Sequence, residues 1–354
     1  AVESDAIGGH VDAFTSREVA SYYVKVLDQQ MERGFDLIAD LVSQPLFDNG
    51  ELDRERNVVL EEIKMVEDTP DDLVHEIFVA NFWPDHPLGR SILGTAETLA
   101  TFDHDRVAEF FRGVYTPRNL VVSGAGNIDH AQFVDMVASR LSNLSANQTE
   151  LNRSTPSSAI PRVVINKELE QTHLMLGTRC PSMLSDDRYS VHVLNVILGG
   201  GMSSRLFQTI REDHALAYAV YSSVTAYTDT GYLSMYAATS PDQLQEAIRL
   251  SIGEFRKLKD EPVTESEIQR AKDQLKVSIM LSLESTSSRM SNLARQEIFF
   301  NRQFTLDEIL ERIDRVTASD VQRMGQEIFG NRELAITAVG QLENLDLASL
   351  ELAV

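Results

Sequence analysis

The feature that most constrains the fold of this chain is an internal repeat. Residues 106–126 align without gaps to residues 320–340, at an offset of 214. Apolar residues align with apolar residues: Val107, for example, aligns with Val321. Gly126 aligns with Gly340. Shorter matches at offsets of 213 and 216 extend the repeat toward the start of each half. Two copies of one pattern within 354 residues favour two domains of the same fold over one large core.

Both strands and helices are expected in each half. Short alternating or apolar runs predict strands near residues 22–27, 120–123, 163–166, 173–177, 217–227, 231–237 and 334–339. Longer runs of helical period lie between them. We therefore predict an α+β fold with two homologous domains, each an antiparallel-rich sheet packed against helices. Ser, Thr, Asn and Pro crowd residues 142–162, so we assign residues 1–145 to the first domain, 146–161 to a linker and 162–354 to the second domain.

An acidic stretch from Leu52 to Glu76 is predicted to be helical, with a break near Thr69-Pro70. Glu55 and Glu62 are seven residues apart, so they project from one side of the helix, beside an apolar stripe. A carboxylate at the margin of a core is costly unless a cation, a metal or strong donors compensate it. Two interpretations follow: a metal-binding role, or a solvated face whose acids pair with basic neighbours along the helix, Arg54, Arg56 and Lys64.

The internal repeat bears on this choice. The offset of 216 places Leu52, Glu55, Val59 and Glu62 on Ile268, Ala271, Leu275 and Ser278. The apolar positions therefore persist in both copies, while the two carboxylates occur only in the first. A role in maintaining the fold should appear in both copies, so the comparison favours a polar task that belongs to the first half alone.

Composition excludes several classes of function. A formal net charge of −22 argues against a surface for nucleic acid or anionic lipid, because both need basic patches. The single cysteine, Cys180, excludes an intrachain disulfide and a CxxC zinc site, and it fits a reducing compartment. No apolar run approaches the length of a membrane span.

Several separated motifs match one family: GGHVDAFTSRE, ERNVVLEEIKMVEDTPDDLVHE, HPLGRSILGT, YTPRNLVVSGAGNID, GGGMSSRLFQTIREDHALAYAVYS and LKVSIMLSLESTSSRMSNLARQE. Over essentially its whole length the chain resembles the insulinase/pitrilysin metallopeptidases, the inverzincins, and most closely their processing-peptidase-like bacterial members. These enzymes carry zinc on H-x-x-E-H plus a distant glutamate. The resemblance implies that Glu62 is this distant ligand. It also implies that Glu55 is a carboxylate that orients the metal ligands without binding the metal itself.

The resemblance also assigns residues that handle substrate. Arg211 and Tyr218 match a family pair that reaches from the second domain to the scissile peptide, where Tyr218 would donate to the developing oxyanion and Arg211 would hold substrate or Tyr218. The strand with Asp12, Ala13 and Phe14 would bind the peptide as an added strand, and the loop at Gly200 would face it. The implied function is a zinc-dependent endopeptidase or oligopeptidase that cleaves a peptide bound between the two domains.

Further expectations concern partners and location. We expect a peptide or an unfolded polypeptide as substrate, with a preference for basic sequences that rests on the net charge alone. Related chains imply a homodimer or a heterodimer with a related subunit. No nucleic acid and no membrane span are expected. The bacterial cytoplasm is the favoured location, and the periplasm stays open.

The sequence departs from the family in two ways. H-x-x-E-H is absent, and no two of the eight histidines lie three or four residues apart. We therefore expect that the first domain lacks its N-terminal part and that these 354 residues do not hydrolyse peptides by themselves. Asp12 stands where many members carry Asn, so substrate preference is expected to differ. The alternative function is a non-catalytic partner subunit that binds substrate or scaffolds a complex.

Overall fold

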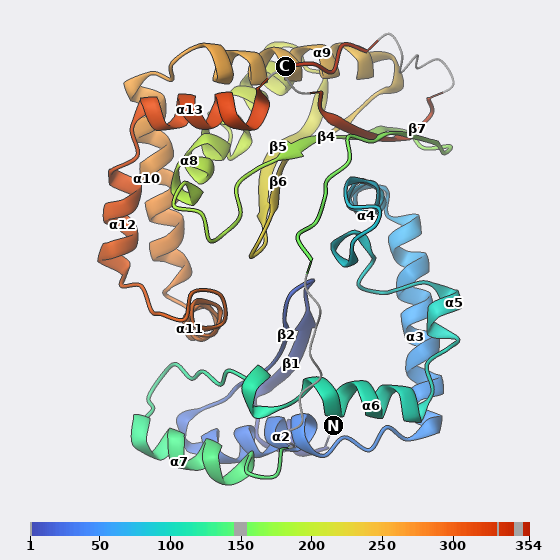
Figure 1. Cartoon of the computed structure of the whole chain (residues 1–354), viewed down its shortest axis with the longest axis vertical. Helices are drawn as coiled ribbons and strands as arrows, with labels where there is room; N and C mark the ends of the chain where they lie inside the picture. Colours follow the sequence, from blue (N-terminus) through green and yellow to red (C-terminus); the bar gives the residue numbers. More distant parts are fainter. Residues whose placement is uncertain (1, 145–153, 331–332, 343–349) are drawn as a thin grey trace. The chain divides into compact units, whose positions relative to one another are not determined.

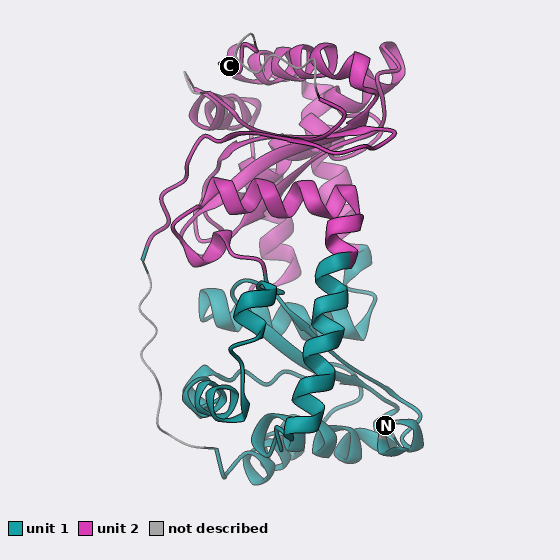
Figure 2. Cartoon of the chain, turned by 90° about the vertical axis from the view of Figure 1, so that its right-hand side faces the viewer, with its two compact units in different colours: residues 1–64, 92–154, 281–303 teal, residues 65–91, 155–280, 304–354 magenta. Residues whose placement is uncertain are grey.

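The computed structural model describes residues 2–144, 154–330, 333–342 and 350–354. The chain divides into two compact units (Figure 2). Unit 1 comprises residues 1–64, 92–154 and 281–303, and unit 2 comprises residues 65–91, 155–280 and 304–354. Among the described residues, no helix combines the length and the apolar character needed to cross a membrane.

The elements of unit 1 are mostly helical (Figure 1). In chain order they are α1 (Val2–Ala6), β1 (His10–Thr15), β2 (Ala20–Lys25), η1 (Asp28–Gln30), α2 (Met31–Ser43), α3 (Asn49–Asp68), α5 (Ala96–Leu99), α6 (His104–Val114), η3 (Pro117–Asn119), α7 (His130–Arg140) and α11 (Thr286–Phe300). The last residues of α3 belong to unit 2. A small core joins α2 to α7 through Phe35, Ala39 and Met136.

Unit 2 contains a five-stranded sheet with helices on both faces. Its elements are α4 (Pro70–Phe82), η2 (Pro87–Gly89), β3 (Arg162–Asn166), β4 (Thr172–Arg179), α8 (Arg188–Gly199), η4 (Phe207–Asp213), β5 (Ala217–Ala226), β6 (Gly231–Thr239), η5 (Pro241–Gln243), α9 (Leu244–Asp260), α10 (Glu265–Ser282), α12 (Leu306–Asp314), α13 (Ala318–Phe329) and β7 (Ala335–Gly340). The last two residues of α10 belong to unit 1.

The strands of unit 2 follow the order β3-β7-β4-β6-β5. Only the β3–β7 pairing is parallel, and the other three are antiparallel. Helices α8, α9 and α13 cover one face, and α4 covers the other. Every residue of β6 is buried, because this inner strand has a helical layer on each side. The expected α+β fold, with sheets packed against helices, is confirmed.

Each half of the sequence contributes one helical segment to the unit that is formed mainly by the other half. Residues 65–91 come from the first half of the sequence but belong to unit 2, where α4 packs on β4 and β7. Residues 281–303 come from the second half but belong to unit 1. The offset of 216 relates these two segments. The predicted domain boundaries stay a prediction, and residues 145–153 of the predicted linker region lie outside the described residues.

Local chemistry explains the break between α3 and α4. Pro70 occupies the first turn of α4, where its missing N–H costs nothing, and Thr69 precedes it in an extended conformation. The Thr69 hydroxyl donates to the Met65 carbonyl oxygen at 2.7 Å. This bond satisfies one of the carbonyl groups that the end of α3 leaves without a partner inside the helix. The predicted break is therefore correct.

Two expectations about local structure are wrong. Residues 120–123 form no strand: Leu120 is extended, but no described strand pairs with this segment. The apolar stripe of α3 is not part of a core either, since no residue of that helix is buried. Val59 and Ile63 are only half-buried, and Val58 is exposed.

Candidate functional site

Arg211 and Tyr218 lie together in unit 2, as the resemblance implies. The guanidinium carbon of Arg211 lies 4.3 Å from the centroid of the Tyr218 ring and 4.8 Å from that of Phe207. Arg211 Nη1 also donates to the backbone oxygen of Tyr218 at 2.8 Å. Tyr218 is nevertheless 77% exposed. Its phenol is thus held in place by Arg211 while remaining open to a ligand.

The backbone that carries this pair is irregular in three places. Arg211 lies on a π-helix, η4. π-Helices are rare in proteins, but where they occur they are often found at functional sites. Ala215 follows with a φ of 51°. This left-handed conformation is unfavourable for a residue with a side chain. A register shift between Ala217 and Ala219 then places Tyr218 in a β-bulge at the start of β5. Such irregularities cluster where a fold presents side chains for function.

The glycine-rich loop before η4 is fixed by α10. The Gln274 side chain donates to the Gly200 carbonyl oxygen at 2.8 Å. A Cβ on Gly199 would lie 2.3 Å from the Ser222 backbone nitrogen, so the loop touches β5 too closely for any other residue. Gly200 therefore lies in a rigid loop that leads directly into the π-helix.

An ion pair closes the end of this loop. Arg205 Nε donates to Glu267 Oε1 at 2.8 Å, and both side chains are at most 20% exposed. Burial alone raises the pKa of the Glu267 carboxyl, but hydrogen bonds from Arg205 and from the backbone and hydroxyl of Thr264 outweigh it and lower this pKa to about 2. Glu267 is therefore ionised at neutral pH and anchors Arg205, six residues before Arg211.

Glu55 and Glu62 are exposed on α3 of unit 1, two helical turns apart. The basic side chains of this helix pair with other carboxylates, in the pairs Arg54–Glu51, Arg56–Asp53 and Lys64–Glu61. Among the described residues, neither the Glu55 nor the Glu62 side chain makes an ion pair or a hydrogen bond. Lys64 therefore compensates Glu61, whereas Glu55 and Glu62 are exposed to solvent without a basic partner among the described residues.

The residues present do not form a zinc site by themselves. A catalytic zinc ion takes three protein ligands and keeps one open position. Within the ranges that the structure describes, no group of three His, Cys, Asp or Glu side chains is placed to hold a metal ion. Glu62 supplies one carboxylate, and Glu55 is seven residues away on the same helix. Glu62 alone therefore does not hold zinc in this chain.

The predicted substrate strand is β1, which pairs with β2 in antiparallel register. No other described strand pairs with β1, so its second edge is open in the part of the chain that the structure describes. Asp12, Ala13 and Phe14 are all exposed on this strand. An open edge with free N–H and C=O groups can accept an extended peptide as an additional strand.

Two residues of these sites were missed from the sequence. Phe207 stacks on Arg211 from four residues away, a spacing that places two side chains on one face of a helix. Tyr23 lies directly opposite Asp12 and donates its hydroxyl to Asp12 Oδ2 at 2.9 Å. The spacing F-x₃-R carried a signal for Phe207, whereas Tyr23 became visible only once the strand register was known.

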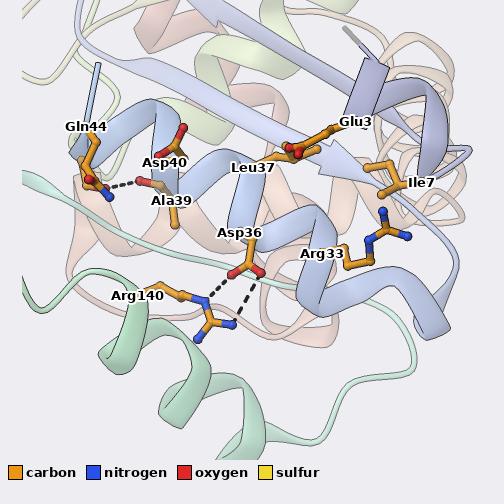
Figure 3. A pocket seen from close by; sticks show the side chains of 10 residues that line it. Glu3, Ile7, Arg33, Asp36, Leu37, Ala39, Asp40, Gln44 and Arg140 are labelled. Carbon is orange, nitrogen blue, oxygen red and sulfur yellow. Dashed lines mark hydrogen bonds and ion pairs between the residues drawn. The ribbon is translucent and has the colours of Figure 1, made fainter. Parts of the chain in front are cut away.

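A cavity of unit 1 contains none of the predicted site residues. It has a volume of about 530 Å³ and is lined by residues of α1, α2 and α7, among them Asp36, Asp40, Arg33 and Arg140 (Figure 3). Asp36 and Arg140 pair with each other across it. Charges of both signs line this cavity, and most of them are exposed to solvent, so it selects no class of ligand.

Comparison with known proteins decides the family. The model described as "Insulinase (Peptidase family M16)" matches residues 1–96, and that of the "Peptidase M16 inactive domain" matches residues 101–275. The chain is 41% identical over 325 residues to "Uncharacterized zinc protease YmxG" of Bacillus subtilis (strain 168), a match that covers 92% of this chain and 79% of that protein. The chain belongs to the M16 (insulinase) peptidase family.

A second relative agrees with this assignment, and two solved structures share the fold. The M16 chain is 35% identical over 358 residues to "Uncharacterized zinc protease SCO5738" of Streptomyces coelicolor, covering 99% of this chain and 78% of that protein. Its fold matches the crystal structure of a peptidase M16 inactive domain from Pseudomonas fluorescens, with a TM-score of 0.86, 21% identity, and coverage of 96% and 82%. A protease from Helicobacter pylori matches with a TM-score of 0.83, 22% identity, and coverage of 95% and 82%.

Proposed function

We propose that this M16 chain acts in the hydrolysis of peptide bonds by a zinc-dependent endopeptidase or oligopeptidase. In this proposal β1 holds the substrate as an added strand, and Tyr218, positioned by Arg211, donates a hydrogen bond to the carbonyl oxygen of the scissile bond. Glu62 is the zinc ligand that this chain supplies. The substrate is a peptide or an unfolded polypeptide.

The observation that carries the proposal is the state of Tyr218. A tyrosine that serves packing buries its ring. The Tyr218 ring is instead 77% exposed, while two separate contacts from Arg211 hold it. A phenol fixed in this way loses little entropy when it donates to a ligand, and oxyanion stabilisation depends on donors that are already in place. The Arg211–Tyr218 pair is therefore suited to polarise a carbonyl.

The state of Glu62 supports a role outside the fold itself. Its carboxylate is exposed and unpaired among the described residues, although three basic side chains lie on the same helix. In the proposal, the remaining zinc ligands come from outside these 354 residues. When bound, the metal would activate a water molecule for attack on the peptide bond.

A second function also has a specific observation in its favour. H-x-x-E-H is absent from the 354 residues, and a chain without it fits a non-catalytic partner subunit that presents peptide to an active one. In that case β1 would still bind peptide, and the assembly would be a heterodimer. A homodimer of identical chains would fit the peptidase instead.

Peptide binding by the chain itself tests the proposal. A fluorescein-labelled extended peptide is titrated with the 354-residue chain, and hydrogen exchange locates the bound peptide. We expect saturable binding with slower exchange of the β1 amides. Tyr218→Phe should leave peptide binding within about two-fold, because the hydroxyl serves the transition state rather than the ground state. Absence of protection in β1 would contradict the proposal.

A further inference from the structure

The β1–β2 pair has two different faces. The register places Val11 opposite Val24, and an added Cβ on Gly34 of α2 would lie 3.3 Å from Val24 Cγ2, so this face meets α2. Side chains alternate along a strand, so His10, Asp12 and Phe14 project from the opposite face. These three residues are exposed, with side-chain exposures of 67% for His10 and 50% for Asp12.

The carboxylate of Asp12 is fixed at the centre of this outer face. Tyr23 donates to Oδ2 at 2.9 Å from the neighbouring strand, and the Ala13 N–H donates to Oδ1 at 2.8 Å. The hydrogen bond from Tyr23 and that from Ala13 lower the pKa of the Asp12 carboxyl below its usual value. His10 Nε2 also lies 3.4 Å from Asp12 Oδ2, so the free acceptor positions of this carboxylate are mainly on Oδ1, and its orientation is already set.

The neighbours of Asp12 on the same face differ from it in chemistry. Phe14 follows two residues later with 47% of its surface exposed. His10 precedes by two residues, and Lys25 lies opposite His10. Negative charge on this face is therefore confined to one position of β1, with an aromatic ring on one side of it and basic groups on the other.

A peptide added to the open edge of β1 would place its side chains beside those of β1. Directly opposite residues in neighbouring strands have Cβ atoms roughly 4.5–5.5 Å apart, and opposite charges at such positions stabilise pairing whereas like charges destabilise it. Aromatic side chains pair favourably with aromatic or β-branched ones. The outer face of β1 thus favours one residue type at one register position and another type two residues away.

We propose that Asp12 and Phe14 determine substrate sequence: Asp12 selects lysine or arginine at the peptide position directly opposite it, and Phe14 selects an aromatic or β-branched residue two positions away. This inference rests on the proposed strand addition to β1. The substrate class is then an extended peptide in which a basic residue and an apolar residue are separated by one residue. Asn at position 12 would keep a hydrogen-bond acceptor but lose the preference for a cation.

Matched peptides test the proposal on the full 354-residue chain. Three labelled peptides are identical except that the central residue, two positions from a phenylalanine, is lysine, norleucine or glutamate. Affinity is measured by fluorescence anisotropy at low ionic strength, where screening of the Asp12 charge is weakest. We expect the lysine peptide to bind about two- to five-fold tighter than the norleucine peptide, with the glutamate peptide weakest.

Two charge-removing variants separate a local effect from net charge. Asp12→Asn should equalise the affinities for the three peptides. Asp105→Asn removes an acid that is 98% exposed and, like Asp12, has a histidine beside it, and this variant should keep the preference for lysine. Hydrogen exchange of β1 and β2 in the free proteins checks that the hairpin is intact in both variants.

The outcomes distinguish this inference from the proposed function. Loss of the lysine preference in Asp12→Asn alone supports the inference. Protection of the β1 amides by peptide, with an unchanged lysine preference in Asp12→Asn, overturns the inference and leaves the proposed function standing. Failure of every peptide to protect β1 overturns both.

Discussion

Arg211 holds Tyr218 at two points, through a guanidinium 4.3 Å from the centre of its ring and through a hydrogen bond to its backbone oxygen. The first contact fixes the ring and the second fixes the bulge from which the ring projects. This arrangement uses the planar, many-donor geometry that distinguishes arginine from lysine. It makes Tyr218 the most strongly positioned exposed aromatic side chain of the predicted site.

Replacing Arg211 should release Tyr218. In Arg211→Lys the charge remains but the stacking and the bulge contact are lost, so we expect the ring resonances of Tyr218 to move toward random-coil values. Carbon-labelled tyrosine and assignment by Tyr218→Phe make this measurable by NMR. An exposed cation–π contact contributes about 0.5–1 kcal/mol, so the free energy of unfolding should fall by no more than about that amount. Unchanged Tyr218 resonances would show that Arg211 does not position the ring.

Acid should weaken unit 2 through Glu267. The pKa of this carboxyl is lowered to about 2 in the folded chain, against an ordinary value of 4.5. A lowered pKa stabilises the fold above the unfolded-state pKa, and this stabilisation is lost as the pH falls from about 4.5 to about 2. Glu267→Gln should be less stable at neutral pH and should lose less stability across this interval. Urea titrations at several pH values measure both effects, and parallel pH profiles would contradict them.

The exchanged helix α4 should be essential to unit 2. Phe78 is fully buried between α4 and the sheet. Phe78→Ala should therefore cost about 3–5 kcal/mol of unfolding free energy. Trp83, the only tryptophan of the chain, is equally buried in the same apolar cluster and reports on its packing. We expect a red shift of its emission at lower urea concentrations.

Phe110 provides the matched control for this substitution. It is a phenylalanine of unit 1 that is 64% exposed. Phe110→Ala should change the unfolding free energy by less than about 0.5 kcal/mol, because an exposed ring leaves no cavity when it is removed. Equal losses of stability in the two variants would show that the packing of α4 on the sheet is not what holds unit 2 together.

The 354-residue chain should neither bind zinc stoichiometrically nor cleave peptides in a chelator-sensitive way. A single carboxylate from Glu62 does not meet the ligand requirement of a catalytic zinc ion. Elemental analysis after dialysis against zinc, and a quenched fluorogenic peptide with and without chelator, measure the two properties. One bound zinc per chain that disappears in Glu62→Gln would contradict the expectation, and so would chelator-sensitive cleavage.

Sequence reasoning located the elements well where local chemistry decides them. Pro70 ended one helix and began the next as expected, and the residues predicted for β4, β5, β6 and β7 form these strands. Arg211 and Tyr218, the pair that the resemblance to a family singled out, are in contact, and their roles at the site stay a prediction. The repeat at offsets of 213 to 216 correctly indicated related helical segments in the two halves.

The sequence alone did not determine which segments that are far apart along the chain pack against or pair with one another. An apolar pattern shows which face of a helix seeks cover, but not which sheet provides it, so the exchange of residues 65–91 and 281–303 was not foreseen. Val121 and Val122 have strand propensity, yet a strand needs a neighbouring backbone. The pattern of apolar residues around Arg211 does not distinguish a π-helix from an α-helix. The contact of Tyr23 with Asp12 depends on strand register.

The most direct test of the account is hydrogen exchange across β1 with and without an extended peptide. We expect the amides of residues 10–15 to exchange more slowly in the presence of saturating peptide, because the open edge of β1 becomes paired. Exchange in the five-stranded sheet of unit 2 should change little. Saturable binding that protects another part of the chain and leaves β1 unprotected would contradict the claim that this strand holds the substrate.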